Sequence, residues 1–137
     1  MAALADQYGA GPVLLKDIAR NEDISEKYLS LIVIPLRGSG LIQSTRGARG
    51  GYTLARSPDA ITVANIMDVL EGEPCLVDCV NNPAMCSRVP ICPTRDIWSL
   101  LSEKIRETLS AITLTSLVNM RRAKAKNILK AIQPGSS

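Results

Sequence analysis

The fold is decided by two adjoining stretches, ISEKYLSLIVIPLRGSGLI at residues 24–42 and STRGARGGYTL at residues 44–54. The first predicts a helix that begins after Ser25, because a serine side chain can cap the free amides of a first turn. Its apolar residues recur at helical spacing, at Leu29, Ile32, Val33 and Leu36. Pro35 predicts a kink or a late helix end, and the glycines at 38 and 40 should end the helix.

The second stretch alternates in the manner of two short strands joined by the tip Arg-Gly-Ala-Arg-Gly-Gly. Glycine allows the positive φ angles that a tight tip needs, and the tip carries Arg46 and Arg49 into solvent. A helix followed by a basic hairpin is typical of a winged helix-turn-helix. We therefore predict a mostly α fold with one small β-hairpin.

This outline is suited to DNA. A helix enters the major groove with its N-terminal residues nearest the base edges, here Ser25, Glu26, Lys27, Tyr28 and Ser30. Arg46 or Arg49 could then lie along the backbone or enter a narrow minor groove. The alternative is a helix packed on a hairpin in an unrelated α+β domain, with glycines chosen only for the turn. The interleaving of arginine and glycine favours DNA.

Composition narrows the function further. The 137 residues include 46% apolar residues and carry a net charge of +3, so any basic surface must be local. There is no histidine, no phosphate-binding loop and no nucleophile elbow, so we do not expect an enzyme. No apolar run is long enough to span a membrane, and no leader opens the chain, so we expect the reducing cytoplasm.

Three regions follow from the pattern. Residues 1–71 form the predicted DNA-binding domain, which includes a supporting helix over 14–21 and a helix over 63–71 capped by Thr62. The apolar stripe of that second helix is expected at Val63, Ile66, Met67 and Leu70. Residues 72–93 form a cysteine-rich loop without regular structure. Residues 94–137 form a long helix and a helical tail with a frayed end at 133–137.

The long helix, over about 94–111, carries an apolar stripe that must be covered. The stripe consists of Ile97, Trp98, Leu101, Ile105, Leu109 and Ile112. We predict that the same helix of a second copy covers it, because a two-fold dimer matches paired DNA half-sites. The alternative is burial against its own domain. The later basic cluster, which includes Arg121 and Arg122, is interpreted as a solvated face or a secondary DNA contact.

The cysteine loop contains Cys75, Cys79, Cys86 and Cys92. Zinc knuckles usually begin with a two-residue gap between cysteines, and every gap here is longer, so zinc is the weaker interpretation. Wide gaps suit an iron–sulfur cluster, which thiolates ligate. A thiol redox switch would use the same cysteines without a metal, and small buried cysteines with no chemistry would also fit the pattern.

Several motifs together resemble the Rrf-two family of bacterial winged-helix transcription regulators. They are Ile-Ser-x-x-Tyr-Leu at 24–29, Leu-Arg-x-x-Gly-Leu-Ile at 36–42, Arg-Gly-Ala-x-Gly-Gly-Tyr-x-Leu at 46–54, and the last three cysteines before Asp96-Ile97-Trp98. The resemblance covers nearly the whole chain. It implies a homodimer that binds palindromic promoter DNA. It also implies that an iron–sulfur cluster or the redox state of the thiols sets the affinity for that DNA. It further implies Cys79, Cys86 and Cys92 as cluster ligands, Lys27, Tyr28 and Ser30 as recognition-helix contacts, and Arg46 in the minor groove.

The chain departs from this family pattern in three ways. It is expected to be shortened at its N-terminus, where members carry a further basic, Tyr-containing helical segment. Arg95 stands where the cluster-binding branch has a histidine. Cys75 is an extra cysteine that could replace that ligand or fill an apolar gap. We predict a DNA-binding repressor whose loop binds an iron–sulfur cluster or senses redox state, nitric oxide or iron–sulfur status. The alternative is a small metal or electron carrier without sequence-specific DNA binding.

Overall fold

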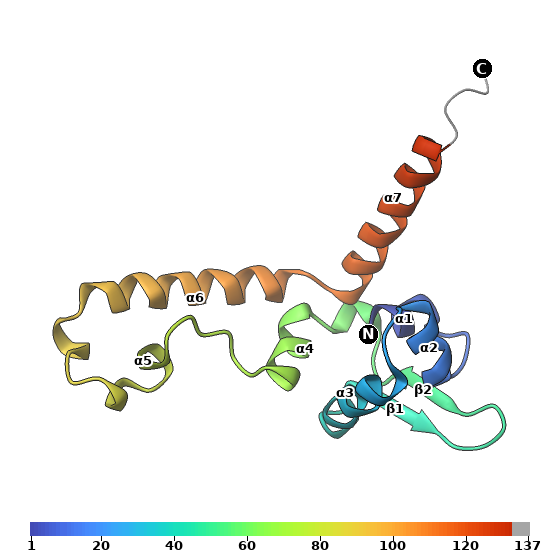
Figure 1. Ribbon diagram of the computed structural model, residues 1–137, viewed down its shortest axis with the longest axis horizontal. Helices are drawn as coiled ribbons and strands as arrows, with labels where there is room; N and C mark the ends of the chain where they lie inside the picture. Colours follow the sequence, from blue (N-terminus) through green and yellow to red (C-terminus); the bar gives the residue numbers. More distant parts are fainter. Residues whose placement is uncertain (133–137) are drawn as a thin grey trace.

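A computed structural model describes residues 1–132, with a winged domain at one end and a long arm that extends from it (Figure 1). The expected frayed tail at 133–137 lies outside the described residues. In chain order the elements are α1 (Ala2–Asp6), α2 (Leu15–Asn21), α3 (Glu26–Gly38), β1 (Ile42–Thr45), β2 (Gly51–Leu54), the 3-10 turn η1 (Pro58–Ala60), α4 (Val63–Leu70), α5 (Asp78–Asn81), the 3-10 turns η2 (Pro83–Met85) and η3 (Val89–Ile91), α6 (Pro93–Ala111) and α7 (Leu114–Ile132).

Helices α2 and α3 form the predicted helix-turn-helix. The Ser25 hydroxyl accepts a hydrogen bond of 3.0 Å from the backbone N–H of Tyr28, so the predicted cap is confirmed. Leu29, Val33 and Leu36 are buried on one face of α3. This face packs against α2 and α4, which leaves the opposite face of α3 uncovered.

Pro35 does not end α3, because the helix continues to Gly38. Proline lacks the N–H that would bond the carbonyl of Leu31, four residues earlier. Leu31 is 62% exposed, so water can reach the helix surface on this side. The helix therefore ends three residues after Pro35, at the predicted glycines, and not at the proline itself, whereas the alternative of a kink at Pro35 stays a prediction.

The wing is a two-stranded antiparallel hairpin in which Ile42 pairs with Leu54 and Thr45 with Gly51. Val13 forms an antiparallel β-bridge with Tyr52 of β2. The Val13 N–H donates to the Tyr52 carbonyl at 2.9 Å, and the Tyr52 N–H donates to the Val13 carbonyl at 2.8 Å. Gly51 has a φ of 148°, and a Cβ there would lie 2.5 Å from the carbonyl oxygen of Val13. This position therefore requires glycine for the wing to meet the chain before α2.

The core lies between α1, α2, α3, the hairpin and the start of α7. Ile61 and Leu114 are fully buried, and Val118 is 5% exposed. Two backbone hydrogen bonds join residues 61–63, where the chain leaves the core, to residues 112–114, where it returns. The Leu114 N–H donates to the Ile61 carbonyl at 2.9 Å, and the Val63 N–H donates to the Ile112 carbonyl at 2.8 Å. The first turns of α7 thus belong to the core of the winged domain.

The arm, residues 72–111, comprises the cysteine loop and α6 (Figure 1). The loop is more regular than expected, because α5, η2 and η3 are short helical turns within it. The stripe expected on α4 also differs, since Ala64 is buried whereas Leu70 is 36% exposed. The last turn of α4 lies beyond the core, next to the arm. None of the described helices combines the length and the apolarity that crossing a membrane needs.

Candidate nucleic-acid interface and cysteine loop

The start of α3 presents polar side chains to solvent. Ser25 and Lys27 are exposed, and Tyr28 is 58% exposed. Ser30 is half-buried and donates a hydrogen bond of 2.8 Å to the carbonyl of Glu26, so its hydroxyl proton is already used within the helix. Ser25 accepts the capping bond, which leaves Lys27 and Tyr28 as the side chains most available to a ligand.

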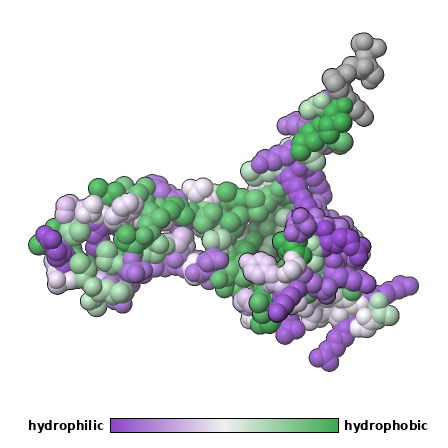
Figure 2. Space-filling model, in the orientation of Figure 1, coloured by the Kyte–Doolittle hydropathy of each residue, from purple (hydrophilic) through white to green (hydrophobic). Residues whose placement is uncertain are grey.

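The wing tip carries the two predicted arginines. Arg46 and Arg49 are both exposed, and neither guanidinium forms an ion pair or hydrogen bond with a residue in the described part of the chain. Hydrophilic side chains project from this end of the molecule (Figure 2). Because α3 packs against β1, the wing is held beside the recognition helix. Two cationic groups are thus presented on a hairpin that packs against α3, where they can contact the phosphate backbone of bound DNA.

Arginines of α7 neutralise carboxylates of the winged domain. Arg121 lies 2.8 Å from Glu22, and Arg122 lies 2.8 Å from Asp6. From sequence, these two arginines were interpreted as a solvated face or a secondary DNA contact. Both are exposed, as a solvated face requires, and each also pairs with a carboxylate. The pairing reduces the negative charge near the helix-turn-helix and leaves the wing arginines as free cations.

The four thiols of the loop are free. Cys86 is exposed, and Cys75, Cys79 and Cys92 are half-buried. Within residues 1–132, no three Cys, Asp or Glu side chains lie close enough together to hold a metal ion. An iron–sulfur cluster is ligated by several thiolates, so the loop in this arrangement does not fit a cluster. The thiol of Cys75 instead donates a hydrogen bond of 2.8 Å to the carbonyl of Val77.

Cys92 lies at the N-terminus of α6 in a setting that favours its thiolate. Its sulfur lies 3.4 Å from the Thr94 hydroxyl, which can donate to it. This bond, the backbone N–H groups of Arg95 and Thr94, and the charge of Arg88 hold the pKa of Cys92 below its ordinary value, although desolvation partly opposes them. A thiolate at a helix N-terminus is also stabilised by the helix dipole. Cys92 is therefore the thiol whose surroundings favour the reactive thiolate form.

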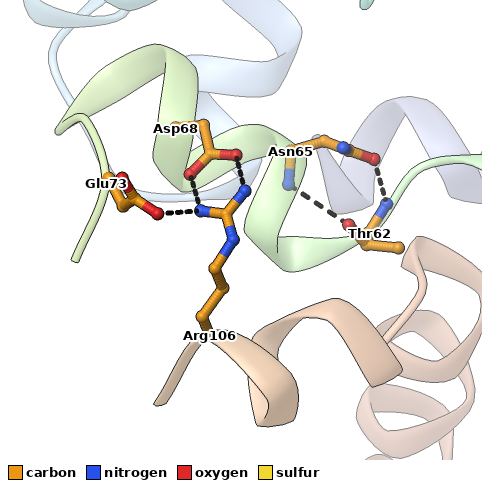
Figure 3. Close-up of polar contacts among 5 residues, drawn as sticks. All are labelled: Thr62, Asn65, Asp68, Glu73 and Arg106. Carbon is orange, nitrogen blue, oxygen red and sulfur yellow. Dashed lines mark hydrogen bonds and ion pairs between the residues drawn. The ribbon is translucent and has the colours of Figure 1, made fainter. Parts of the chain in front are cut away.

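Two further arginines fasten the cysteine loop to α6. Arg95 donates from Nε to the carbonyl of Cys79 at 3.1 Å. Arg106 donates to both carboxylate oxygens of Asp68 at 3.1 and 3.3 Å and lies 3.2 Å from Glu73 (Figure 3). Sequence reasoning missed the Arg106 cluster, because its partners lie far back in the chain and no local spacing relates them.

The apolar stripe of α6 is largely uncovered. Ile97, Trp98 and Leu101 are 56%, 37% and 41% exposed. The other three members, Ile105, Leu109 and Ile112, are half-buried. Leu101, Ile105 and Leu109 line a shallow groove of about 280 Å³, and hydrophobic side chains extend along the arm (Figure 2). Within residues 1–132, the chain therefore leaves most of this stripe uncovered.

Comparison with known proteins places the chain among transcription regulators. A family model described as Rrf2, iron-dependent transcriptional regulator, matches residues 1–120. The HTH-type transcriptional regulator CymR of Bacillus subtilis is 39% identical over 119 residues, which cover 87% of this chain and 81% of that protein. The solved structure of that CymR, described as a global cysteine regulator, has a TM-score of 0.71 with 87% of both chains covered. The IscR structure from T. potens also has a TM-score of 0.71, with 37% identity and coverage of 88% and 78%.

Proposed function

Because the chain belongs to the Rrf2 family of transcriptional regulators, we propose that two copies of it bind palindromic promoter DNA and repress transcription. The family match and the winged fold identify a DNA-binding regulator. They remove the small metal or electron carrier that the sequence left as the alternative. Neither the palindrome nor repression follows from the fold alone, so both are parts of the proposal.

The observation that carries the proposal is the exposed start of α3 beside a wing with two unpaired arginines. Lys27 and Tyr28 are free to reach base edges or phosphates in the major groove. Arg46 follows β1 directly and would reach the adjacent backbone or minor groove, where negative potential attracts a guanidinium. Arg49 would add a phosphate contact, and Ser25 and Ser30 would support the first turn.

The dimer in this proposal forms through α6. An exposed stripe on a long helix is covered most simply by the same helix of a second copy, which gives a two-fold axis. Two winged domains related by that axis would contact two half-sites, with recognition helices about one helical turn of DNA apart, roughly 34–36 Å. Ile97, Trp98 and Leu101 are the residues with most surface left to bury.

We propose further that the cysteine loop is the sensor and that its thiols are the reacting groups. The lowered pKa of Cys92, which is only half-buried, supports an attack by its thiolate on an electrophile such as a disulfide, a peroxide or a nitric-oxide-derived species. An iron–sulfur cluster on Cys79, Cys86 and Cys92 has no part in this mechanism, because the loop does not gather these residues. Such free thiols suit a reducing cytoplasm.

A DNA-binding measurement tests the main proposal. Sites are first selected from random duplexes by the wild-type protein, and affinity is then measured across salt concentrations. Replacement of Arg46 by alanine should weaken binding by about 1–3 kcal/mol if it enters the groove, or lower the salt slope by about one if it contacts a phosphate. Lys126→Ala is the control, since Lys126 is an exposed cation on α7, away from the wing and from α6. Absence of salt-dependent, sequence-selective binding by the wild type would refute the proposal.

A second preparation tests the sensor. Protein purified without oxygen should be colourless and contain neither iron nor sulfide if the thiols act alone. Visible absorbance that disappears in Cys79→Ser or Cys92→Ser would show that the loop closes around a cluster, and would overturn the thiol mechanism.

A further inference from the structure

We propose that Arg106 is a positioning residue that fixes the direction of α6 against the winged domain, and so sets the half-site spacing that the dimer accepts. The inference rests on the proposed function, since it concerns a dimer on paired half-sites. It adds a residue that contacts neither DNA nor the thiols.

The contacts of Arg106 fix an orientation as well as a distance. Its two terminal nitrogens lie 3.1 and 3.3 Å from the two oxygens of Asp68 on α4. A planar guanidinium that forms two parallel bonds to one carboxylate is held in one plane. Glu73, which follows α4, lies 3.2 Å from the same guanidinium and adds a third contact (Figure 3).

The position of this cluster makes it a second point of attachment. The first point is the return of the chain to the core, where the Ile112 carbonyl and Leu114 N–H bond to Val63 and Ile61 at 2.8 and 2.9 Å. A rod held at one point can swivel, whereas a rod held at two points has a defined direction. Arg106 lies six residues before Ile112, or about 9 Å along the helix at 1.5 Å per residue.

The packing of α4 against α6 also supports a positioning role for Arg106. Ser102 is the buried residue of α6, with 8% exposed, and it lies one turn from Arg106 on the same face. Its hydroxyl donates to the Trp98 carbonyl at 2.9 Å, so this small side chain is satisfied without a partner on α4. A small residue lets the two helices approach closely, and Arg106 then fixes their angle.

The angle between α6 and the winged domain matters for DNA binding because α6 is long, so a small rotation displaces its far end by several ångströms. Helix α6 has 19 residues, which corresponds to about 28 Å of length at 1.5 Å per residue. A swivel of about 10° would displace the far end by roughly 5 Å, which exceeds the rise of one base pair, about 3.4 Å. Two domains carried on such rods would therefore lose their match to one spacing if Arg106 were released.

The cluster is too exposed to act chiefly through stability. The side chains of Arg106, Asp68 and Glu73 are 45%, 33% and 60% exposed, and exposed ion pairs contribute little to folding. The winged domain has its own core away from this site. Replacement of Arg106 should therefore leave a folded protein with an altered geometry.

The test uses the site selected by the wild-type protein, rebuilt with one or two base pairs inserted or removed at its centre. Affinity is measured for the full dimer site at each spacing and for a single half-site. The wild type should prefer one spacing. In Arg106→Ala, that preference should fall about tenfold, while half-site affinity stays unchanged. The exchange variant Arg106→Glu with Asp68→Arg should restore the preference, and Lys126→Ala, an exposed change on α7, should behave as the wild type.

Each outcome decides the inference. If the spacing profile of Arg106→Ala coincides with that of the wild type, Arg106 does not position α6. A uniform loss at all spacings, together with a lower Tm, would likewise overturn the inference in favour of a purely structural role. If the wild type binds no selected site, the proposed function itself fails, which the other two outcomes do not imply.

Discussion

The winged domain and the arm differ in the burial of their apolar side chains. The buried apolar residues of the described chain belong to the N-terminal 64 residues and to the start of α7, at Leu114 and Val118. The arm contains no buried apolar residue in its described length, and it exposes Leu76, Ile97, Trp98 and Leu101 among others. The winged domain thus has a core of its own, although Leu31 and Ile34 of α3 are exposed, whereas the described arm has no buried apolar side chain at all.

This difference indicates that the winged domain and the arm have separate roles in the protein. A domain with its own core keeps the recognition helix and wing in fixed geometry, which DNA readout requires. An arm that is held to it by a backbone return and an ion-pair cluster keeps one direction as long as both attachments hold, and can change direction when the exposed cluster is released. Stability should therefore reside in the domain, and assembly and control in the arm.

The largest effect is expected from removing a core side chain. Leu114→Ala should lower the free energy of unfolding by about 2–5 kcal/mol, because Leu114 is fully buried and leaves a cavity. Urea unfolding at several protein concentrations measures it, and the loss should not depend on concentration. Leu101→Ala on the arm is the matched variant. Its smaller loss should shrink as the protein is diluted below the dissociation constant of the dimer, because wild type and variant are then both monomers. Equal, concentration-independent losses would contradict this separation of roles.

The next effect concerns assembly. Ile97→Asp should weaken the dimer about 100-fold, roughly 2.8 kcal/mol, because it would bury a charge at the proposed interface. Sedimentation measures the dissociation constant. Asn127→Asp, an exposed change on α7, is the control and should have little effect. A dimer that tolerates Ile97→Asp would place the interface away from this stripe.

The sequence predicted the elements whose signals are local. Ser25 before a helical stripe, glycines around a basic tip and Thr62 before an apolar run predicted α3, the wing and α4, and the structure confirms these elements. Burial of Leu114 was not predictable in this way. It depends on the chain returning to Ile61 after the whole arm, and no periodicity records that return.

Prediction of the candidate DNA-binding surface and of the ion pairs is limited in the same way to features with local sequence signals. The exposure of Lys27, Tyr28 and the wing arginines could be expected from their places at a helix start and a hairpin tip. The pairs Arg106–Asp68, Arg121–Glu22 and Arg122–Asp6 join residues 38, 99 and 116 positions apart. Opposite charges at such separations are common in any chain, so only the folded geometry identifies the partners.

A change inside the wing tests whether the domain is rigid up to its edge. Gly51→Ala should cost about 1–3 kcal/mol of stability, because alanine is strained at this φ and its Cβ would collide with the Val13 carbonyl. Loss of the Val13–Tyr52 bridge should also displace the wing arginines and weaken DNA binding. Ala48→Ser, in the exposed tip, is the control. If Gly51→Ala keeps full stability and affinity, the wing is more adaptable than its hydrogen bonds indicate.

The smallest effect concerns the reactivity of Cys92 within the arm. Because the pKa of Cys92 is lowered, more of this thiol is thiolate near neutral pH than in a cysteine at its ordinary pKa. Thr94→Val removes the hydroxyl that contributes most to the lowered pKa, so alkylation of Cys92 in this variant should begin at higher pH and be several-fold slower at neutral pH than in the wild type. The difference should disappear in acid, where Cys92 is protonated in both proteins. Mass spectrometry of the Cys92 peptide across pH measures it, with Ser87→Ala in the exposed loop as the control. Identical Cys92 profiles in the wild type and Thr94→Val would mean that the N-terminus of α6 does not activate Cys92, and the arm would then respond through another of its thiols.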